Sequence, residues 1–291
     1  MGSVFGRLPH FQEIRIFLIM FRFAMFEWFF FVLGLAVGSF VTVLTERYDE
    51  GETVVRGRSR CNHCRKKIFW FDNIPLLSFF MLGGRCRHCR RVIGWRYPLT
   101  EFLTGVSFLA LAWGTQTLDL RQFLGLIIPA GIFALLIGAA VYDWRTMRIP
   151  MLLVYWSLAL GLLFQVWRYL FFPEVTVGQI WLSLLGGVVA FGALYLLSLV
   201  SDERWMGYGD AYVAAVGGLL VGLPAVVYYL TLAFGLGALV GLLWLVVFDK
   251  TLRTAVPFAP FLAVAAIVGF LWPQFYLRLF EGFFQLIDFV V

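Results

Sequence analysis

The chain has 291 residues, of which 62% are hydrophobic and 14% charged. So small a polar fraction cannot cover a water-soluble protein of this size, which excludes a soluble enzyme and predicts an all-α polytopic membrane protein. The formal net charge of +6 is concentrated between residues 46 and 97, where twelve Lys/Arg stand against five Asp/Glu. Without a nucleic-acid-binding motif, such a loop is typical of the cytoplasmic side of a membrane, next to anionic lipid, and no nucleic-acid partner is expected.

The N-terminal part of the chain divides into two predicted segments. Residues 1–25 mix aromatic and charged side chains and are expected to form an interfacial amphipathic segment. A removable signal peptide is not expected, because no small-residue cleavage site follows a short apolar core. The first transmembrane helix is predicted over residues 26–45, about the length that crosses a bilayer. Within it, Gly34 and Gly38 form a small-xxx-small face that lets another helix approach closely.

Residues 46–97 are predicted to form a small cytoplasmic zinc-binding domain of the zinc-ribbon kind. Two C-x-x-C knuckles separated by 21 residues lie in this segment, and four thiolates satisfy tetrahedral Zn²⁺ without an open position. A structural zinc ion would hold a domain that has little core of its own. Redox-active dithiols are the alternative, whereas structural disulfides are not expected in a reducing compartment. The predicted metal ligands are Cys61, Cys64, Cys86 and Cys89.

Three further features of this loop carry expectations. His63 and His88 lie inside the knuckles and are expected to face solvent or to lie behind the ligands, because four cysteines already complete the zinc shell. The apolar run at residues 69–80 is expected to dip to the membrane surface. Glu101, just after the breaker Pro98, is expected to meet the N-terminus of the second transmembrane helix.

Seven more transmembrane helices are predicted between residues 98 and 275, the membrane catalytic domain, which makes about eight in total. An amphipathic tail is predicted over residues 276–291. We call the predicted cytoplasmic domain at residues 46–97 the zinc loop. Because successive transmembrane helices cross the membrane in alternating directions, the end of the third helix, at Asp143, and the start of the sixth, at Asp210, are predicted on the same cytoplasmic face as this loop. The two acids are therefore predicted to lie at the same depth.

Two acids at one membrane face suggest a hydrolytic site. Either aspartate alone could simply cap or anchor a helix, but a pair that shares one proton can activate water and protonate a peptide carbonyl oxygen. Asp143 lies in Tyr-Asp-Trp-Arg and Asp210 in Gly-Tyr-Gly-Asp. Gly207 and Gly209 are expected to allow a tight bend and a close approach of a substrate chain. The chain has no Gly-x-Ser-x-Gly or His-Glu-x-x-His motif, which argues against serine and zinc hydrolases.

In order along the chain, these motifs resemble those of the type IV prepilin peptidases, GxGD-type membrane aspartyl proteases that also act as N-methyltransferases. The resemblance covers nearly the whole chain and rests on Gly34-x-x-x-Gly38-Ser39-Phe40, Arg47, both knuckles, Asn73-Ile-Pro-Leu-Leu-Ser, Trp95-Arg-Tyr-Pro-Leu-Thr-Glu101, Asp143, Ile149-Pro150, Gly207-x-Gly209-Asp210 and Pro257-Phe-Ala-Pro260-Phe. Thr42, Met151 and Tyr212 depart from the family pattern, which usually has Asn, Asn and Lys at these positions.

The resemblance implies that Asp143 and Asp210 are the catalytic pair of an inner-membrane enzyme whose active site faces the cytoplasm. Its substrates would be type IV prepilins or pseudopilins, which lose a short basic leader. S-adenosylmethionine would then donate a methyl group to the exposed amine, at a site that the sequence does not assign to residues.

Two alternatives stay open. A presenilin- or signal-peptide-peptidase-like protease also uses Tyr-Asp and Gly-x-Gly-Asp, but its Pro-Ala-Leu signature has only Pro224-Ala-Val as a counterpart, at the other membrane face, and it does not explain a zinc loop. A non-enzymatic transporter or scaffold would use the carboxylates to bind a proton or a cation.

Overall fold

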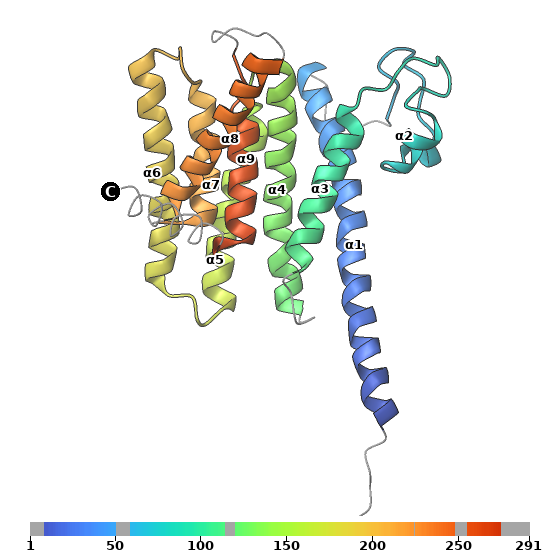
Figure 1. Ribbon diagram of the computed structural model, residues 1–291, viewed down its shortest axis with the longest axis horizontal. Coiled ribbons are helices and arrows are strands. Elements are labelled where there is room, and N and C mark those ends of the chain that lie inside the picture. Colours follow the sequence, from blue (N-terminus) through green and yellow to red (C-terminus); the bar gives the residue numbers. More distant parts are fainter. Residues whose placement is uncertain (1–8, 51–58, 114–119, 224, 248–254, 275–291) are drawn as a thin grey trace, which may run out of the picture.

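A computed structural model describes residues 9–50, 59–113, 120–223, 225–247 and 255–274 (Figure 1). In these ranges the regular elements are helices, accompanied by two isolated antiparallel bridges. The all-α prediction is therefore confirmed. The elements are α1 (Pro9–Glu50), η1 (Trp70–Asn73), α2 (Leu77–Met81), α3 (Arg96–Trp113), α4 (Leu120–Thr146), α5 (Met151–Phe171), α6 (Val177–Ser201), α7 (Tyr208–Val221), α8 (Val226–Val247) and α9 (Ala259–Leu271).

The long helices coincide with the predicted transmembrane segments. Each of the eight segments predicted from the sequence falls on one of the helices α1 and α3–α9 within the described ranges. Five helices of the described chain, α1, α4, α5, α6 and α8, are long and apolar enough to cross a membrane, whereas α7 and α9 are shorter apolar helices. The protein is thus a multi-pass membrane protein, and a count of eight crossings stays a prediction.

Helix α1 is longer than the predicted first span. It runs without a break for 42 residues, and its candidate membrane span covers Met25–Tyr48. No change of backbone direction separates residues 9–25 from the span, so their interfacial position stays a prediction. The predicted tail at 276–291 lies outside the described residues.

Glycines bring two pairs of helices into close contact. A Cβ atom added at Gly34 would lie 2.7 Å from the Thr104 carbonyl oxygen, and one at Gly38 would lie 2.8 Å from the Glu101 Cα atom. The small-xxx-small face of α1 therefore packs directly against the α3 backbone, as predicted. Helices α6 and α7 meet in the same way, because a Cβ atom at Gly186 would lie 2.5 Å from the Gly218 carbonyl oxygen.

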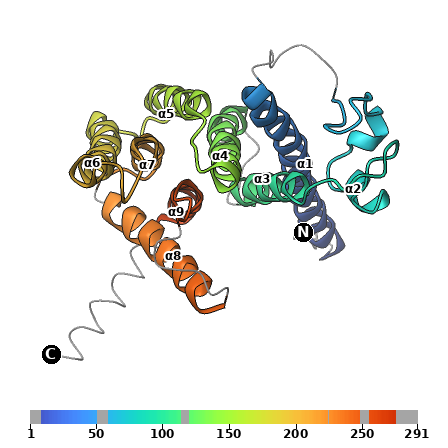
Figure 2. The same ribbon diagram turned by 90° about the horizontal axis from the view of Figure 1, so that it is seen from above.

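Helix α4 lies between two groups of helices. Seen from above, α1, α3 and the zinc-loop segment lie on one side of it, and α5–α9 lie on the other (Figure 2). Helix α9 packs against both α4 and α7, and the fully buried Phe133, Val213 and Leu262 contribute to this core. This packing brings the C-terminal end of α4 next to the N-terminal ends of α7 and α9.

Candidate functional site

Asp143 lies in the last turn of α4, where its side chain is buried among helices. Only 5% of the residue is exposed. The backbone N–H of Ala259, the first residue of α9, donates a hydrogen bond to Asp143 Oδ2 at 3.3 Å. The first N–H groups of a helix have no partner within the helix, so this contact uses one of them to fix the orientation of the carboxylate.

Asp210 lies in the first turn of α7 and is 8% exposed. It is close enough to Asp143 for the charge of that carboxylate to act on it. Its Oδ1 atom is buried and has no hydrogen-bond partner within the described part of the chain. Because an unpaired buried carboxylate oxygen is costly, such an atom is typical of a site where water or a substrate completes the bonding. The structure thus brings together the two predicted acids.

The two glycines before Asp210 differ in what they contribute. A Cβ atom at Gly209 would lie 3.0 Å from the Ile149 side chain, so the missing side chain lets Ile149 pack against the start of α7. Gly207 has φ −77° and ψ 151°, values that any residue adopts. The predicted need for a tight bend is therefore wrong for Gly207, and the close approach at Gly209 is made by the chain itself.

Aromatic side chains surround the end of α4 that carries Asp143. Tyr48 from α1 makes an edge-on contact with Tyr142, with ring centroids 6.1 Å apart, and Trp144 meets Trp244 from α8 at 5.8 Å. The Arg145 guanidinium lies 5.4 Å from the centre of the Tyr142 ring. Aromatic side chains of this kind are typical of a membrane–water boundary.

Tyr212, one of the three departures from the family pattern, belongs to an aromatic cluster beside Asp210. Its ring lies 5.0 Å from that of Phe191 and 6.1 Å from that of Tyr155, with both pairs edge-on. Such contacts stabilise a packed helix surface by about 0.5–1.5 kcal/mol per pair. The position at which the resemblance leads us to expect a lysine is thus occupied by an aromatic side chain that packs against neighbouring helices.

The four cysteines of the zinc loop converge on one point. Their Sγ atoms all lie within 4.8 Å of one another, and all four thiols are free. The two knuckles repeat one another, because Arg65 and Arg90 donate backbone hydrogen bonds to Cys61 and Cys86 and both have positive φ, 54° and 58°. Four convergent thiols on two tight turns fit Zn²⁺ in donor type and number, so the predicted metal ligands come together.

The pKa values of two of the four thiols are shifted in opposite directions. Burial tends to raise the pKa of Cys61, but hydrogen bonds from the Cys64 and His63 backbone and from neighbouring thiols outweigh it and lower the pKa to about 7. For Cys89, a backbone hydrogen bond from Arg91 lowers the pKa, and burial together with the other thiols raises it to about 11. A metal ion takes all four groups as thiolates, so binding would release protons.

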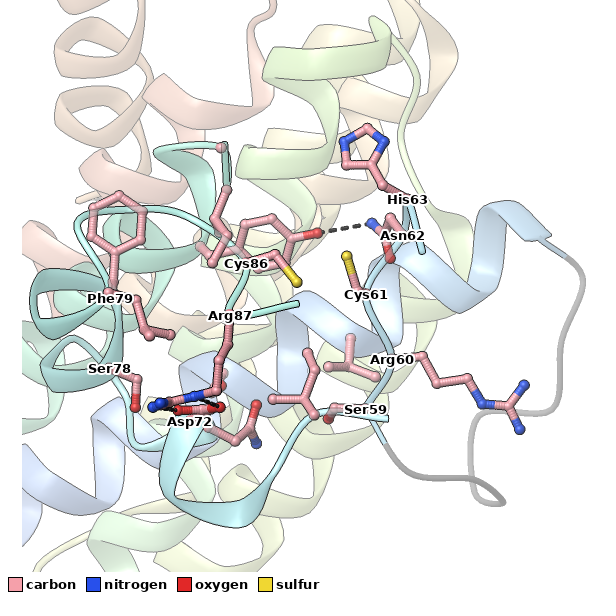
Figure 3. Close-up of a pocket in the computed structure, with 18 of the residues that line it drawn as sticks. Ser59, Arg60, Cys61, Asn62, His63, Asp72, Ser78, Phe79, Cys86 and Arg87 are labelled. Atoms are coloured by element: carbon pink, nitrogen blue, oxygen red, sulfur yellow. Dashed lines mark hydrogen bonds and ion pairs between the residues drawn. The ribbon is translucent and has the colours of Figure 1, made fainter. Parts of the chain in front are cut away.

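A cavity of about 390 Å³ lies between the zinc loop and helices α1 and α3 (Figure 3). Its opposite walls are joined by Asn62, which donates hydrogen bonds to Glu46 Oε1 at 3.2 Å and to the Tyr97 hydroxyl at 3.0 Å. Arg96 pairs with Glu46 at 2.9 Å, and the Tyr97 hydroxyl donates to the same carboxylate. Neither Asp143 nor Asp210 lines this cavity.

Glu101 is placed differently from the expectation. Helix α3 begins at Arg96, two residues before Pro98, and has no acidic residue in its first turn. Glu101 is buried, and its Oε2 atom accepts a hydrogen bond at 2.8 Å from the backbone N–H of Leu76 in the zinc loop. The helix N-terminus is therefore not its partner. Instead, Glu101 ties the loop to α3 at the edge of the cavity, a contact that nothing in the local sequence indicates.

Two family models match separate parts of the chain, and each part contains one of the two groups of residues described above. Residues 32–115 match the family model described as the bacterial peptidase A24 N-terminal domain, and residues 130–242 match that of the type IV leader peptidase family. The first match contains the cysteines and the cavity, and the second contains Asp143 and Asp210. No solved structure matches the chain.

Curated relatives match most of the chain. It is 35% identical over 212 residues to a protein of Klebsiella pneumoniae (70% of this chain, 89% of the relative) and 30% identical over 273 residues to one of Aeromonas hydrophila (83% and 89%). A Myxococcus xanthus protein is 32% identical over 232 residues, which cover 76% of this chain and 64% of that protein's length. All three bear the name prepilin leader peptidase/N-methyltransferase.

Proposed function

The chain belongs to the type IV leader peptidase family, and from this premise we propose that it is a membrane aspartyl endopeptidase. Its substrates are type IV prepilins or pseudopilins, from which it removes a short basic leader at the cytoplasmic face of the inner membrane. The observation that carries the proposal is the buried pair Asp143 and Asp210 inside the part of the chain that matches the peptidase family.

In the proposed reaction, the two carboxylates share one proton. The ionised carboxylate takes a proton from water while the water oxygen forms a bond to the scissile carbonyl carbon, and the protonated carboxylate donates its proton to the carbonyl oxygen. As the resulting intermediate collapses, the C–N bond breaks and the leaving nitrogen takes a proton from the pair. The Ala259 N–H on Asp143 Oδ2 holds one carboxylate in place, and the unpaired Oδ1 of Asp210 is the atom available to the incoming water.

The proposed orientation follows from the basic residues. The end of α4 that carries Asp143 also carries Arg145 and is followed by Arg148, both exposed. This end lies on the same side of the molecule as the ends of α1 and α3 to which the zinc loop is attached (Figure 1). Basic residues next to transmembrane segments favour the cytoplasmic side, which supports an active site at that face.

A second activity, methylation of the new N-terminal amine, is proposed from the relatives' name. S-adenosylmethionine, when bound, would supply the methyl group that replaces a proton on this amine. In this proposal the four cysteines hold a structural Zn²⁺, because their donor set leaves no open position for catalysis.

Purified full-length protein in detergent micelles, mixed with a prepilin and followed by intact-mass spectrometry, tests the peptidase proposal. Asp143→Asn and Asp210→Asn keep the size of each side chain and should abolish leader removal. Asp202→Asn is the matched control, because Asp202 is an exposed acid whose positive φ asparagine also tolerates, and it should cleave normally. Near-normal turnover by either buried-site variant would remove the pair from the mechanism.

The presenilin-like and transporter alternatives gain no specific support. The matched N-terminal domain with its cysteines is part of the family shown here, so the zinc loop needs no separate explanation. Under the transporter hypothesis the micelle assay gives no cleavage even for the unaltered chain.

A further inference from the structure

The middle of the zinc loop, which contains η1 and α2, exposes large apolar side chains. Within the described part of the chain, Trp70 is 75% exposed, Leu77 52%, Phe80 64% and Met81 77%. Residues 69–84 contain no lysine or arginine and a single acid, Asp72. A contiguous apolar surface of this kind marks a place where another apolar phase or molecule makes contact.

The polar groups of the same stretch are paired within the protein. Asp72 and Arg87 form a bidentate pair, with contacts of 2.6 and 2.8 Å, and only 7% of the Asp72 side chain is exposed. The hydroxyl of the buried Ser78 accepts a hydrogen bond from the Ile74 N–H and donates one to the Phe71 carbonyl oxygen. Apolar side chains outside and satisfied polar groups inside suit a hydrocarbon environment, which offers polar groups no partners.

Contacts with α1 and α3 fix the depth of this stretch along the transmembrane helices. The Leu76 N–H donates to Glu101 Oε2 of α3 at 2.8 Å, and a Cβ atom added at Gly38 of α1 would lie 2.8 Å from the Glu101 Cα atom. Gly38 lies ten residues before Tyr48, the end of the candidate membrane span of α1, which is a rise of about 15 Å. Because a whole hydrocarbon core measures about 30 Å, Leu76 is anchored well inside the span.

The two ribbon views agree with this depth. In Figure 1, α2 lies beside α3 and below the level of the end of α4 that carries Asp143. Figure 2 shows α2 on the outer side of α1 and α3, away from α4. In a multi-pass membrane protein, a segment at this level on the outside of the helices borders lipid.

Basic residues flank the apolar stretch on both sides. Residues 60–67 and 85–91, which contain the two knuckles, each have four Lys/Arg, and Lys66, Lys67, Arg85 and Arg91 are exposed. Apolar and aromatic side chains next to exposed basic ones are typical of interfacial membrane anchors, whose cations meet anionic headgroups. The charge pattern therefore favours a lipid surface over an apolar protein partner.

We propose that residues 69–81, here called the insertion tip, are embedded in the leaflet of the bilayer next to the zinc loop. Acyl chains cover Trp70, Leu77, Phe80 and Met81, and anionic headgroups meet the basic knuckles. This position is deeper than the surface contact expected from the sequence, because Glu101 anchors the tip below the end of the α1 span. The zinc loop is thus fixed against the membrane at a constant height, and this holds whichever reaction the protein catalyses.

Methionine oxidation in nanodiscs that hold one chain each tests the insertion tip in the unaltered protein. Met81 is 77% exposed and Met147, after α4, is 50% exposed, so hydroxyl radicals would oxidise Met81 faster if the zinc loop stood in water. We expect lipid to reverse this order, with sulfoxide formation read by peptide mass spectrometry. Without prepilin or a second chain in the disc, only lipid can protect Met81. Oxidation of Met81 as fast as that of Met147, or faster, would overturn the proposal.

Photocrosslinking identifies what covers the tip. Phe80→benzoylphenylalanine places the probe on the tip, and His63→benzoylphenylalanine is the control at an exposed position of the first knuckle. Figure 3 shows His63 on the other side of the cavity from Phe79, the neighbour of Phe80. Irradiation of the full chain in membranes should add the mass of one phospholipid at position 80 and not at position 63. No lipid adduct at position 80, or an adduct there to a second chain or to added prepilin in place of lipid, would overturn the proposal. Leader removal, assayed separately, decides the peptidase proposal on its own.

Discussion

The aspartate pair and the zinc-loop cavity are built by different means. Asp143 and Asp210 are held by helices that bury apolar residues on several sides, and their positions follow from the packing of α4, α7 and α9. Between residues 59 and 95 the zinc loop has only η1 and α2, nine residues in all. Its shape depends on turns, on the thiol cluster and on polar contacts such as those of Asn62. One region should therefore be insensitive to metal removal, and the other should depend on it.

The largest expected effect is a loss of leader removal with methylation kept, which would assign the two activities to different regions. Asp143→Asn should lower the rate of leader removal by about 10²–10⁴-fold, the usual contribution of a proton-transferring group. The same variant, given a pilin whose leader has already been removed, should methylate its N-terminus at the wild-type rate. The measurement is a time course by intact-mass spectrometry for each substrate. Loss of both activities would show that the regions share one site and would break the comparison.

Metal removal should have the opposite pattern of effects, with methylation lost and leader removal kept. We expect one zinc per chain by elemental analysis, and a strong chelator should abolish methylation and open residues 59–95 to added protease, because structural zinc supplies the folding free energy of such domains. Leader removal should persist, since the helix packing around Asp143 needs no metal. Absence of zinc, or full methylation after replacement of all four cysteines by serine, would contradict this prediction.

Acid should reproduce part of the chelator effect. Protons compete with Zn²⁺ for the four thiolates, so the apparent affinity for zinc falls as the pH is lowered. Zinc release into a colorimetric chelator should consequently rise between pH 8 and pH 6. Equal release at both pH values would contradict a metal bound by thiolates.

The sequence predicts the two regions unequally. The positions of the long helices, the glycine face of α1 and the convergence of the cysteines follow from local patterns, namely apolar length, small-residue spacing and knuckle spacing. The contact between Glu101 and Leu76 spans 25 residues and depends on where α3 begins. The sequence predicts that the helix follows Pro98, but proline is tolerated in the first turn, and α3 starts at Arg96. That shift places Glu101 beyond the first turn, facing the loop.

The cavity itself has no sequence signature, for a related reason. Asn62, Glu46 and Tyr97 meet although 16 and 35 residues separate Asn62 from its two partners, and no periodicity encodes such a meeting. Many of the cavity residues belong to the sequence motifs, but only the fold shows that they enclose a common space. In contrast, counting the predicted transmembrane segments predicts that Asp143 and Asp210 lie at the same depth.

Helix packing can be used to damage the cavity without touching a polar group. Gly38→Leu would press against the α3 backbone next to Glu101, and overpacking of this kind costs about 1–3 kcal/mol. Because α1 and α3 hold the zinc loop in place, methylation of a prepilin should fall more than leader removal does. Thermal unfolding in micelles measures the loss of stability, and intact-mass spectrometry of the prepilin measures the two activities. Gly192→Leu is the control, since nothing lies within 4 Å of a Cβ atom there, and equal effects of both variants would dismiss the packing argument.

The smallest expected effect concerns the polar contacts that hold the zinc loop against the helices. Glu46→Gln keeps the shape of the side chain but removes the charge that pairs with Arg96 at 2.9 Å, and partly exposed pairs contribute at most about 1 kcal/mol. The global unfolding temperature should therefore barely change. Hydrogen exchange at residues 59–68 should nevertheless speed up, because the knuckle that carries Asn62 loses a charged acceptor, whereas exchange in α7 should stay constant. Faster exchange in α7 as well would mean that the loop and the aspartate helices unfold as one unit. That result would contradict the proposed independence of the two regions.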